Sequence, residues 1–588
     1  MRSSFNRRLS ALTAILVGAG ILLFGQIASF PFHADAAAYL EDQANNSYRQ
    51  LRDLIPDRGR ILDRNGDLLA GNVMEYTIGA SPNLILDKAR AAHLLAGALK
   101  DDENRILKLL DQPNSQYVVL AQQADTATVQ RVAQLNLLGM TLQPIPKRIH
   151  PQGSLAAQLI GFVAGRDEDG SRRGYVGVEG EYNSELAGQV QTQPISPIPF
   201  EVNALDQPPP GHDIVLTIDR SIQYLAETQL QTAINKYGAV GGSVIVMDPR
   251  TGEILGMASY PSFDPDAFYK TTDPAVLKNP AVSDFYEPGS AFKIVTGSVA
   301  LQSGKMTPDW TYYDSSPLVV GGRQIFNWDR AGHGSQSFVD VFVNSWNIGT
   351  SHIAMTLGED IFYKGLKDFG VGQRTGIDLE GEAAGILHTP GDLYWSDSDL
   401  ATNSFGQGLT VTPLQMLSFT NVIANGGQMM QPHIRLRTLD ADHAIPAIPS
   451  AVRTPISPAV AKTMTDIMVR VVQVGEGVHA QVPGYTVAGK TGTAQIPCTP
   501  GPGCTDGYDD QLNEATFIGF LPADEPRVSI LIKLDKVARF ASETAAPAWS
   551  DLVKRLVVLM EIPTDQQRQA LRAQGGNTAL IAGNPLSQ

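Results

Sequence analysis

The sequence predicts an α+β fold, an antiparallel sheet flanked by helices, for residues 211–562 of the 588-residue chain. Two observations predict it. A short strand from Asp213 leads to Asp219, which can cap an amphipathic helix, and two strand-like runs joined by the turn DPRTGE follow over 241–261. Near the far end, the runs YTVAGKTGTAQI, ATFIGFLPAD and RVSILIKLD supply further strands of the same sheet. A helix combined with an antiparallel sheet indicates a layered α+β domain.

Residues 9–32 predict a membrane-spanning helix. The segment LSALTAILVGAGILLFGQIASFPF carries no charge, and at about 1.5 Å per residue it exceeds a bilayer core of roughly 30 Å. Three arginines precede it, so the positive-inside rule places residues 1–8 in the cytoplasm and the bulk of the chain outside it. The alternative is a cleaved signal peptide, because two small residues, Ala34 and Ala36, imitate a cleavage site.

Residues 33–210 are interpreted as an elongated, β-rich scaffold. In ILDRNGDLLA, the pair Asn65-Gly66 marks a tight turn between two apolar strands. In GYVGVEGEYNSELAGQ, Glu179, Tyr182 and Leu186 recur at helical spacing after a glycine turn. The stretch ISPIPFEVNALDQPPPGHD then predicts a linker, because consecutive prolines resist regular structure.

Composition narrows the classes of function. With 43% hydrophobic residues the chain can bury more than one core, so two or three domains are expected. The formal net charge of -15 argues against nucleic acid as a partner, since no long basic stretch offsets the acidic excess. The ten histidines and two cysteines show no metal-ligand spacing and no Gly-rich phosphate loop follows a strand, so no cofactor is expected.

The segment YEPGSAFKIVTGSVALQSG predicts a helix that opens with a serine and a lysine. A Pro-Gly pair delivers the chain to Ser290, which we expect to cap a helix that ends at Gly304. Ser290 and Lys293 then share one face, with the amine one turn from the hydroxyl. Taken alone, the pair has a simpler interpretation, in which Ser290 only caps the helix and Lys293 only reaches solvent.

A second polar cluster interrupts the segment SFVDVFVNSWNIGTSHIAM. Its first part predicts an apolar helix capped at Ser337 with Asp340 three residues on, followed by a break over Ser345-Trp346-Asn347 and another helical run. The alternative role for these polar residues is to satisfy the unpaired carbonyl groups at the helix break.

A third cluster lies in the strand AGKTGTAQ. Gly492 weakens this strand and lets a ligand or another backbone approach closely. Alternation places Thr491 and Thr493 on one face of the strand, but alternation alone does not aim the Lys490 amine.

The clusters follow one another as Ser290-x-x-Lys293, Ser345-x-Asn347 and Lys490-Thr491-Gly492. This ordered set is typical of penicillin-binding proteins and class A β-lactamases. Each cluster by itself occurs in many unrelated proteins, whereas the ordered set of three is specific for these families. The alternatives of simple capping and carbonyl satisfaction therefore give way to a functional interpretation.

The chain resembles a class B penicillin-binding protein, a monofunctional peptidoglycan D,D-transpeptidase, over nearly its whole length. The resemblance includes the anchor, the pedestal signatures at 58–66 and 177–188, and the nucleophile motif YEPGSAFK. The segment SFGQGLTVTPLQ, Ser404 to Gln415, resembles the division-type branch more than the elongation-type branch.

The resemblance implies an organisation of the whole chain. A cytoplasmic tail (1–8), a transmembrane anchor (9–32) and a pedestal or dimerisation-type domain (33–210) would precede a domain of the serine penicillin-recognising transpeptidase fold (211–562). A flexible tail (563–588) would follow. The protein would be a single-pass protein of the cell membrane with its catalytic domain outside the cytoplasm.

The residues and the resemblance together imply a mechanism. Ser290 would attack the D-Ala-D-Ala carbonyl of a stem peptide, with an unprotonated Lys293 as its base. The backbone N–H groups of Ser290 and Thr493 would stabilise the oxyanion. Ser345 would relay a proton to the departing amine, and Asn347 would hold Lys293 and the substrate amide. A second stem-peptide amine would then form the crosslink.

The third cluster would bind the terminal carboxylate end of the stem peptide that acylates Ser290, the donor peptide. Lys490, with Thr491 and Thr493 around Gly492, would receive the terminal carboxylate in a charge-assisted pairing. β-Lactams would acylate the same serine and inhibit the enzyme. Because no glycosyltransferase signature lies between anchor and linker, a separate membrane glycan polymerase is expected as a partner, together with divisome or elongasome proteins.

Three other functions use the same residues. A D,D-carboxypeptidase or a β-lactamase would admit water to the acyl-enzyme, whereas a transpeptidase excludes it. A β-lactam-sensing receptor would stop at the acyl-enzyme. The long pedestal and the anchor favour the transpeptidase.

The two cysteines, Cys498 and Cys504, lie in the insertion IPCTPGPGCTDGYDD beside the Lys490 strand. Outside the cytoplasm disulfides persist, and the Pro-Gly residues between them can fold the loop back on itself. A disulfide that closes a hairpin at the rim of the site is therefore expected, with two free thiols in a mobile loop as the alternative.

Overall fold

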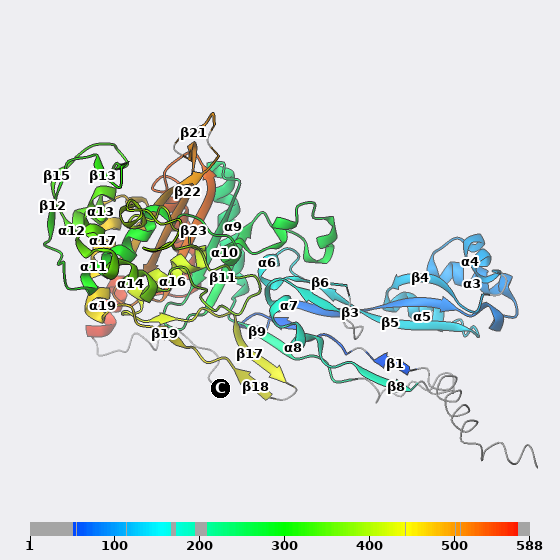
Figure 1. The fold of residues 1–588 in the computed structure, drawn as a ribbon. Coiled ribbons are helices and arrows are strands. Elements are labelled where there is room, and N and C mark those ends of the chain that lie inside the picture. Colours follow the sequence, from blue (N-terminus) through cyan, green and yellow to red (C-terminus); the bar gives the residue numbers. More distant parts are fainter. Residues whose placement is uncertain are drawn as a thin grey trace, which may run out of the picture. The chain divides into compact units, whose positions relative to one another are not determined.

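The computed structural model describes residues 51–54, 56–112, 115–165, 172–194, 208–440, 443–499, 501–505 and 507–573 (Figure 1). The expected cytoplasmic tail (1–8) and anchor (9–32) lie outside these residues, as do most of the expected linker and the end of the expected tail. Among the helices in the described ranges, none is both long enough and apolar enough to cross a bilayer.

The chain forms two compact units. The smaller unit contains two antiparallel strands, β1 (Leu51–Leu54) and β8 (Gln191–Pro194). The larger unit contains the other described helices and strands.

The N-terminal part of the larger unit, residues 57–187, combines long strands with short helices. Its elements are β2 (Ile61–Leu62), β3 (Leu68–Ala80), η2 (Pro82–Leu84), α3 (Lys88–Leu99), α4 (Glu103–Leu110), β4 (Val118–Ala124), α5 (Thr126–Ala133), β5 (Met140–Ile149), α6 (Ala157–Ile160), β6 (Phe162–Ala164), β7 (Arg173–Tyr175), α7 (Gly177–Glu181) and α8 (Asn183–Ala187). The predicted turn between two strands is confirmed, since Gly66 adopts φ +89° between β2 and β3.

A seven-stranded sheet joins this part to later segments of the chain. Its strand order is β18-β17-β9-β2-β3-β4, with β5 paired to β3. Three of its strands come from beyond residue 211: β9 (Asp213–Leu216), β17 (Arg435–Asp440) and β18 (His443–Pro446). The strand predicted at Asp213 therefore exists, but it pairs with β2 and β17 and not with the strands of 241–261.

The predicted α+β domain is built on a six-stranded antiparallel sheet. The order is β11-β10-β23-β22-β20, with the short β21 on β22. The strands are β10 (Gly241–Met247), β11 (Ile254–Tyr260), β20 (Ala488–Pro497), β21 (Cys504–Thr505), β22 (Tyr508–Leu521) and β23 (Val528–Val537). The strand-like runs predicted over 241–261 and in YTVAGKTGTAQI, ATFIGFLPAD and RVSILIKLD all lie in this sheet, unlike the strand predicted at Asp213. Strand β20 forms one end of its main order.

Helices cover both faces of the sheet because successive strand residues face opposite sides. In β22, Phe517 belongs to the core shared with α9 (Arg220–Tyr237) and α18 (Ala545–Leu559). Ile518 belongs to the other core, shared with α11 (Lys293–Gln302) and α16 (Pro413–Ala424). The result is a three-layered domain (Figure 1).

The remaining elements of this domain are short or lie around the second core. They are η3 (Pro265–Lys270), η4 (Pro274–Leu277), α10 (Pro280–Ser283), η5 (Gly289–Phe292), β12 (Thr311–Asp314), β13 (Leu318–Val320), β14 (Arg323–Ile325), β15 (Gly334–Ser337), α12 (Phe338–Val343), α13 (Asn347–Leu357), α14 (Glu359–Phe369), α15 (Asp399–Asn403), β16 (Met429–Met430), β19 (Ala451–Arg453), α17 (Pro458–Val474), η6 (Val478–Ala480) and α19 (Asp565–Ala573).

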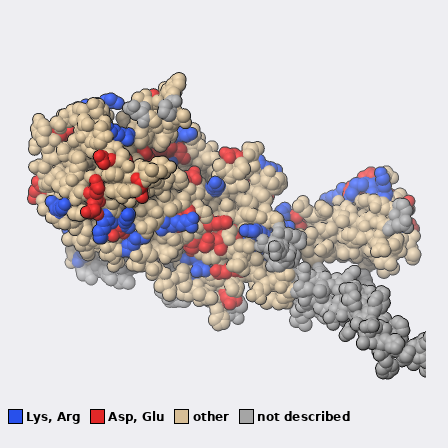
Figure 2. Space-filling view, viewed as in Figure 1, with Lys and Arg blue, Asp and Glu red and all other residues tan. Residues whose placement is uncertain are grey.

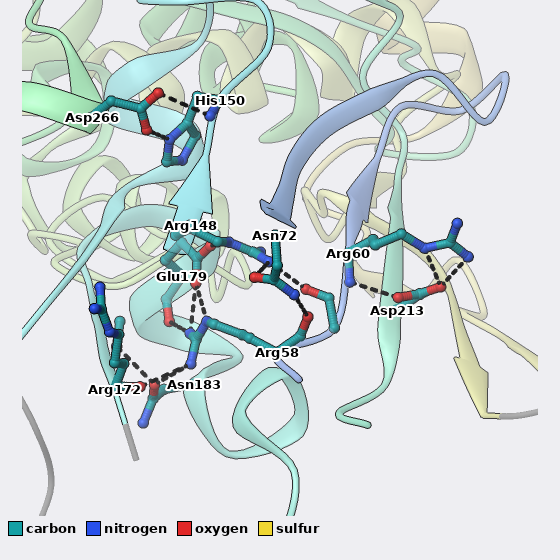
Figure 3. Close-up of polar contacts among 12 residues, drawn as sticks. Arg58, Arg60, Asn72, Arg148, His150, Arg172, Glu179, Asn183, Asp213 and Asp266 are labelled. Atoms are coloured by element: carbon teal, nitrogen blue, oxygen red, sulfur yellow. Dashed lines mark hydrogen bonds and ion pairs between the residues drawn. The ribbon is translucent and has the colours of Figure 1, made fainter. Parts of the chain in front are cut away.

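Buried ion pairs join the two predicted pedestal signatures (Figure 3). Glu179, fully buried on α7, accepts from Arg58 Nε at 2.6 Å and from Arg148 Nε at 2.7 Å. Arg58 also donates to Asn183 Oδ1, and Arg148 donates to the Gly59 carbonyl. This network supports the interpretation of both signatures as scaffold.

The expected flexible tail needs a correction at its start. Residues 565–573 form helix α19, and Arg568, only 3% exposed, pairs with Asp524 and with Asp565. Asp565 also accepts from the Thr486 backbone N–H at 2.7 Å. These contacts anchor a strongly polar segment whose sequence shows no apolar stripe.

Charges of both signs are intermixed over the face drawn in Figure 2, without a continuous basic field among the described residues there.

Candidate active site

The three sequence clusters meet at a cleft beside strand β20. The cleft has a volume of about 1260 Å³, and its lining includes Ser290, Ser345, Asn347, Thr491 and Thr493. The two lysines of the clusters lie beneath this surface and are fully buried. The ordered motifs, spread over some 200 residues of sequence, thus form one polar site.

The serine turn differs in detail from the predicted helix start. Ser290 lies inside the 3-10 turn η5, whose N-cap is Pro288, and the N-cap of the following helix α11 is Phe292. The expected cap role of Ser290 is therefore wrong, because helix α11 begins only at Lys293. The predicted end of the helix is confirmed, with Gly304 at φ +72° just beyond it.

Two glycines allow the serine turn to pack directly on β20. Gly289 has φ +53°, and a Cβ there would lie 2.8 Å from the Thr493 carbonyl oxygen. A Cβ on Gly492 would lie 2.8 Å from the Ala291 Cβ. The predicted close approach at Gly492 is confirmed, and the approaching group is the backbone that carries Ser290.

The second cluster sits at the predicted break between two helices. Ser337 and Asp340 form a capping box at the start of α12, and α13 begins at Asn347. Between them Ser345 has φ +60°, a left-handed conformation that is uncommon for a residue with a side chain. Such strained backbone is concentrated at functional sites, and here it carries the Ser345 side chain to both buried lysines.

Lys293 is held by the second cluster. Its Nζ donates to the Ser345 carbonyl at 2.6 Å, to Asn347 Oδ1 at 2.8 Å and to Ser345 Oγ at 3.3 Å. Burial, together with the positive charge of Lys490, lowers its pKa well below the usual value for lysine, and Glu476 acts in the opposite direction. Among the described contacts, no hydrogen bond joins Lys293 to Ser290.

Lys490 reaches the same serine from the opposite side. Its Nζ donates to Ser345 Oγ at 3.0 Å, and also to the carbonyl and the hydroxyl of Thr491. Burial lowers the pKa of Lys490, while Glu476 raises it. The Lys490 amine therefore points toward Ser345 Oγ, a direction that strand alternation could not predict.

The two threonines of β20 face the cleft together, as alternation predicts. Thr493 Oγ1 accepts from the Ala541 backbone N–H at 3.0 Å, so the hydroxyl proton remains available to the cleft. Thr491 Oγ1 donates to Glu476 Oε2 at 3.1 Å.

Glu476 is a cleft residue that the sequence reasoning missed. It follows α17 between two glycines, 15 residues before Thr491, in a stretch without a recognisable motif. Its carboxylate lies 3.9 Å from Lys490 Nζ. An acidic residue in a glycine-rich turn is the only sequence signal, and that signal is weak.

Glu287 is a second missed residue. It is buried, and it accepts from the Gly408 backbone N–H at 3.0 Å and from the Tyr508 hydroxyl at 3.2 Å. Burial raises its pKa. Tyr508 stands at the start of β22, so this contact ties the insertion after β20 to the turn that carries Ser290.

The expected disulfide between Cys498 and Cys504 is confirmed. It closes the loop between β20 and β21, where the Cys498 backbone N–H donates to the Gly507 carbonyl at 2.8 Å. Pro497, Thr505 and Tyr508 line the cleft, so the closed loop forms part of its rim.

The arrangement suits acyl transfer. A serine hydroxyl lies in the cleft, one turn from a buried lysine whose lowered pKa favours the neutral, proton-accepting form. Ser345 Oγ accepts from both lysines, so its own proton is free to be donated into the cleft.

Comparison with known proteins agrees with this chemistry. Residues 242–554 match the penicillin binding protein transpeptidase domain, and residues 53–208 match the penicillin-binding protein dimerisation domain. Penicillin-binding protein PbpB of Mycobacterium tuberculosis is 34% identical over 596 residues, covering 94% of this chain and 84% of its own length. A Pseudomonas aeruginosa protein named "Probable peptidoglycan D,D-transpeptidase PbpC" is 31% identical, covering 95% of this chain and 96% of its own.

A solved structure shows the same likeness. Penicillin binding protein 3 from Mycobacterium tuberculosis, complexed with aztreonam, superposes with a TM-score of 0.67 at 31% identity. The match covers 87% of this chain and 98% of that chain.

Proposed function

Because the chain belongs to the penicillin-binding proteins that combine a transpeptidase domain with a dimerisation domain, we propose that it is a peptidoglycan D,D-transpeptidase with Ser290 as its nucleophile. One observation carries the proposal: Ser290 lines the cleft one turn from a buried lysine of lowered pKa. Relatives named as peptidoglycan D,D-transpeptidases support it.

In the first half-reaction, Ser290 Oγ attacks the carbonyl of the D-Ala-D-Ala peptide bond and its proton passes to the neutral Nζ of Lys293. The N–H groups of Ser290 and Thr493 stabilise the oxyanion. This assignment is supported by the packing of the serine turn on β20, where Gly289 meets the Thr493 carbonyl.

Collapse of the tetrahedral intermediate breaks the peptide bond. Ser345 gives its proton to the departing D-Ala amine, and the hydroxyl is reprotonated through the lysines that donate to it. Asn347 Oδ1 holds Lys293 throughout, while one N–H of its amide already donates to the Phe326 carbonyl. The other N–H is available to the substrate amide.

The donor's terminal carboxylate binds at Lys490, Thr491 and Thr493, with Gly492 keeping the serine turn close. In the second half-reaction, the amine of another stem peptide attacks the ester carbonyl of the acyl-enzyme. The bond to Ser290 Oγ breaks as the new peptide bond forms, and the proton lost by the amine returns to Ser290 Oγ through Lys293. β-Lactams acylate the same serine and inhibit the enzyme.

We also propose the cellular setting that the sequence indicates. The segment 9–32 anchors the protein in the cell membrane with the cleft outside the cytoplasm, and a membrane glycan polymerase supplies the strands to be crosslinked. The segment Ser404–Gln415 favours a role in division over elongation. Localising a fluorescent fusion at midcell or along the side wall tests this choice.

Labelling by a fluorescent penicillin tests the function. The full-length protein in detergent should be labelled covalently at Ser290, and Ser290→Ala should abolish labelling while circular dichroism shows an intact fold. Ser303→Ala, the same change beyond the other end of α11, should leave labelling in place.

Peptide mapping of the adduct to another serine would contradict the assignment. Rapid release of hydrolysed penicillin would favour the hydrolase alternative, and failure to crosslink stem peptides after acylation would favour the β-lactam-sensing receptor.

A further inference from the structure

Glu476 lies at the carboxylate-binding end of the cleft but outside all three sequence clusters. It follows α17, where its backbone N–H donates to the Val343 carbonyl at 3.2 Å. Its side chain lines the cleft and is 27% exposed. The backbone of this residue is therefore fixed, while its carboxylate has a path to solvent.

The Glu476 carboxylate contacts the two side chains, Lys490 and Thr491, that the proposed mechanism assigns to the substrate carboxylate. Its Oε2 accepts from Thr491 Oγ1 at 3.1 Å and lies 3.9 Å from Lys490 Nζ. A hydroxyl has one proton to donate. Thr491 therefore cannot donate to Glu476 and to an incoming carboxylate at the same time.

Charge makes the competition stronger. Two carboxylates that share one ammonium group repel each other, and repulsion is larger in a partly buried site than in water. Lys490 is fully buried and cannot follow either partner outward, whereas Glu476 is partly exposed. Of the two, Glu476 is the group that can move away.

We propose that Glu476 is a specificity-determining residue of the donor site: its carboxylate occupies the receptor formed by Lys490 and Thr491 and must leave it before an anionic donor binds. This inference rests on the proposed function, which assigns the donor's terminal carboxylate to that receptor. Displacing Glu476 reduces the binding free energy of donors that carry the carboxylate, whereas neutral donors bind without displacing it. Glu476 thereby sets how strongly the cleft prefers a free C-terminal carboxylate.

The test compares two donors on wild-type protein and on Glu476→Gln. One is a D-alanyl thioester donor with a free terminal carboxylate, and the other is the same donor with a terminal carboxamide. Glu476→Gln keeps an acceptor for Thr491 but removes the charge. It should raise the second-order acylation constant of the carboxylate donor by about tenfold, mainly through tighter binding, and change that of the carboxamide donor by less than about twofold.

Glu543→Gln is the matched control, because Glu543 is an acidic residue of the same cleft without a described contact to Lys490 or Thr491. Its effect on the ratio of the two constants should be much smaller than that of Glu476→Gln. Glu476→Asp, which keeps the charge, should retain part of the wild-type discrimination.

An unchanged ratio in Glu476→Gln, or slower acylation by the carboxylate donor, would overturn the inference. Either result leaves the proposed function standing as long as Ser290 is acylated. Absence of acylation in the wild-type protein would instead contradict the proposed function itself.

Discussion

Among single residues, Lys293, the base of the proposed mechanism, shows how burial changes the protonation of an ordinary side chain. A free lysine is protonated at neutral pH, but removal from water penalises the charged form, and Lys490 adds repulsion. The three acceptors around Nζ fix its position beneath the cleft. The same packing therefore determines both the position and the protonation state of the Lys293 amine.

Replacing Lys293 by arginine tests this account. Arginine keeps the positive charge but does not lose its proton in proteins. We expect Lys293→Arg to slow acylation of Ser290 by about a hundredfold or more, since general base catalysis contributes on that order. The measurement is the second-order rate constant for a fluorescent penicillin, with circular dichroism to verify the fold.

The pH dependence of the acylation rate of the wild-type protein is a second test of the role of Lys293. Because the proposed base is the neutral form of Lys293 and its pKa is lowered, acylation should rise with pH in a range below the usual pKa of lysine. An arginine variant that acylates at a near wild-type rate would show that Lys293 is an electrostatic support.

Among the elements, the hairpin after β20 connects the disulfide to the serine turn. Cys498–Cys504 closes the loop, and Tyr508 at the start of β22 donates to Glu287, three residues before Ser290. Among the described contacts, the hydrogen bond from Tyr508 to Glu287 connects the loop to the serine turn. The loop can therefore influence the position of Ser290, the proposed nucleophile, through this hydrogen bond.

Reduction of the disulfide should slow acylation about twofold to fivefold without unfolding the domain, because a short closed loop contributes only on the order of 2 kcal/mol. The rate with a fluorescent penicillin is compared before and after reduction, with free thiols counted by mass spectrometry. Tyr508→Phe, which removes the hydroxyl from Glu287, should slow the oxidised protein to a similar extent. Equal rates in reduced and oxidised protein would contradict the proposed coupling.

For the molecule as a whole, the buried network at Glu179 connects segments that are far apart in the sequence. Arg58 lies 121 residues before Glu179, and Arg148 lies 31 residues before it. Burial alone would raise the pKa of Glu179, but Arg148 and Arg58 outweigh it and hold the pKa below the usual value. The network therefore contributes full stability above the unfolded-state pKa and loses it as the pH falls through the folded-state pKa.

Glu179→Gln should destabilise the protein by about 3–5 kcal/mol, since it leaves two buried arginines without their counter-charge. The thermal midpoint of unfolding should fall clearly. Arg60→Gln is the control, because the Arg60–Asp213 pair is exposed on the arginine side (Figure 3) and such pairs are worth at most about 1 kcal/mol. Equal midpoints for the two variants would contradict a buried, energetically coupled network.

The sequence predicted most of the local elements of the catalytic domain. The strands of the six-stranded sheet, the Ser337 capping box and the helix end at Gly304 each follow from residues within a few positions of one another. Short-range steric and capping effects act over that range, so local patterns suffice. The start of the serine helix was misplaced because the packing of Gly289 and Gly492 converts its first turn to η5.

The order of the three clusters likewise predicted the chemistry, because the ordered set is typical of proteins in which a serine is acylated in this way. The direction of the Lys490 amine, the lowered pKa of Lys293 and the presence of Glu476 in the cleft came only from the tertiary structure. Each depends on burial or on contacts between residues far apart in the chain. Local propensity carries no information about either, because the packing of the helices against the sheet determines which distant side chains share a desolvated site.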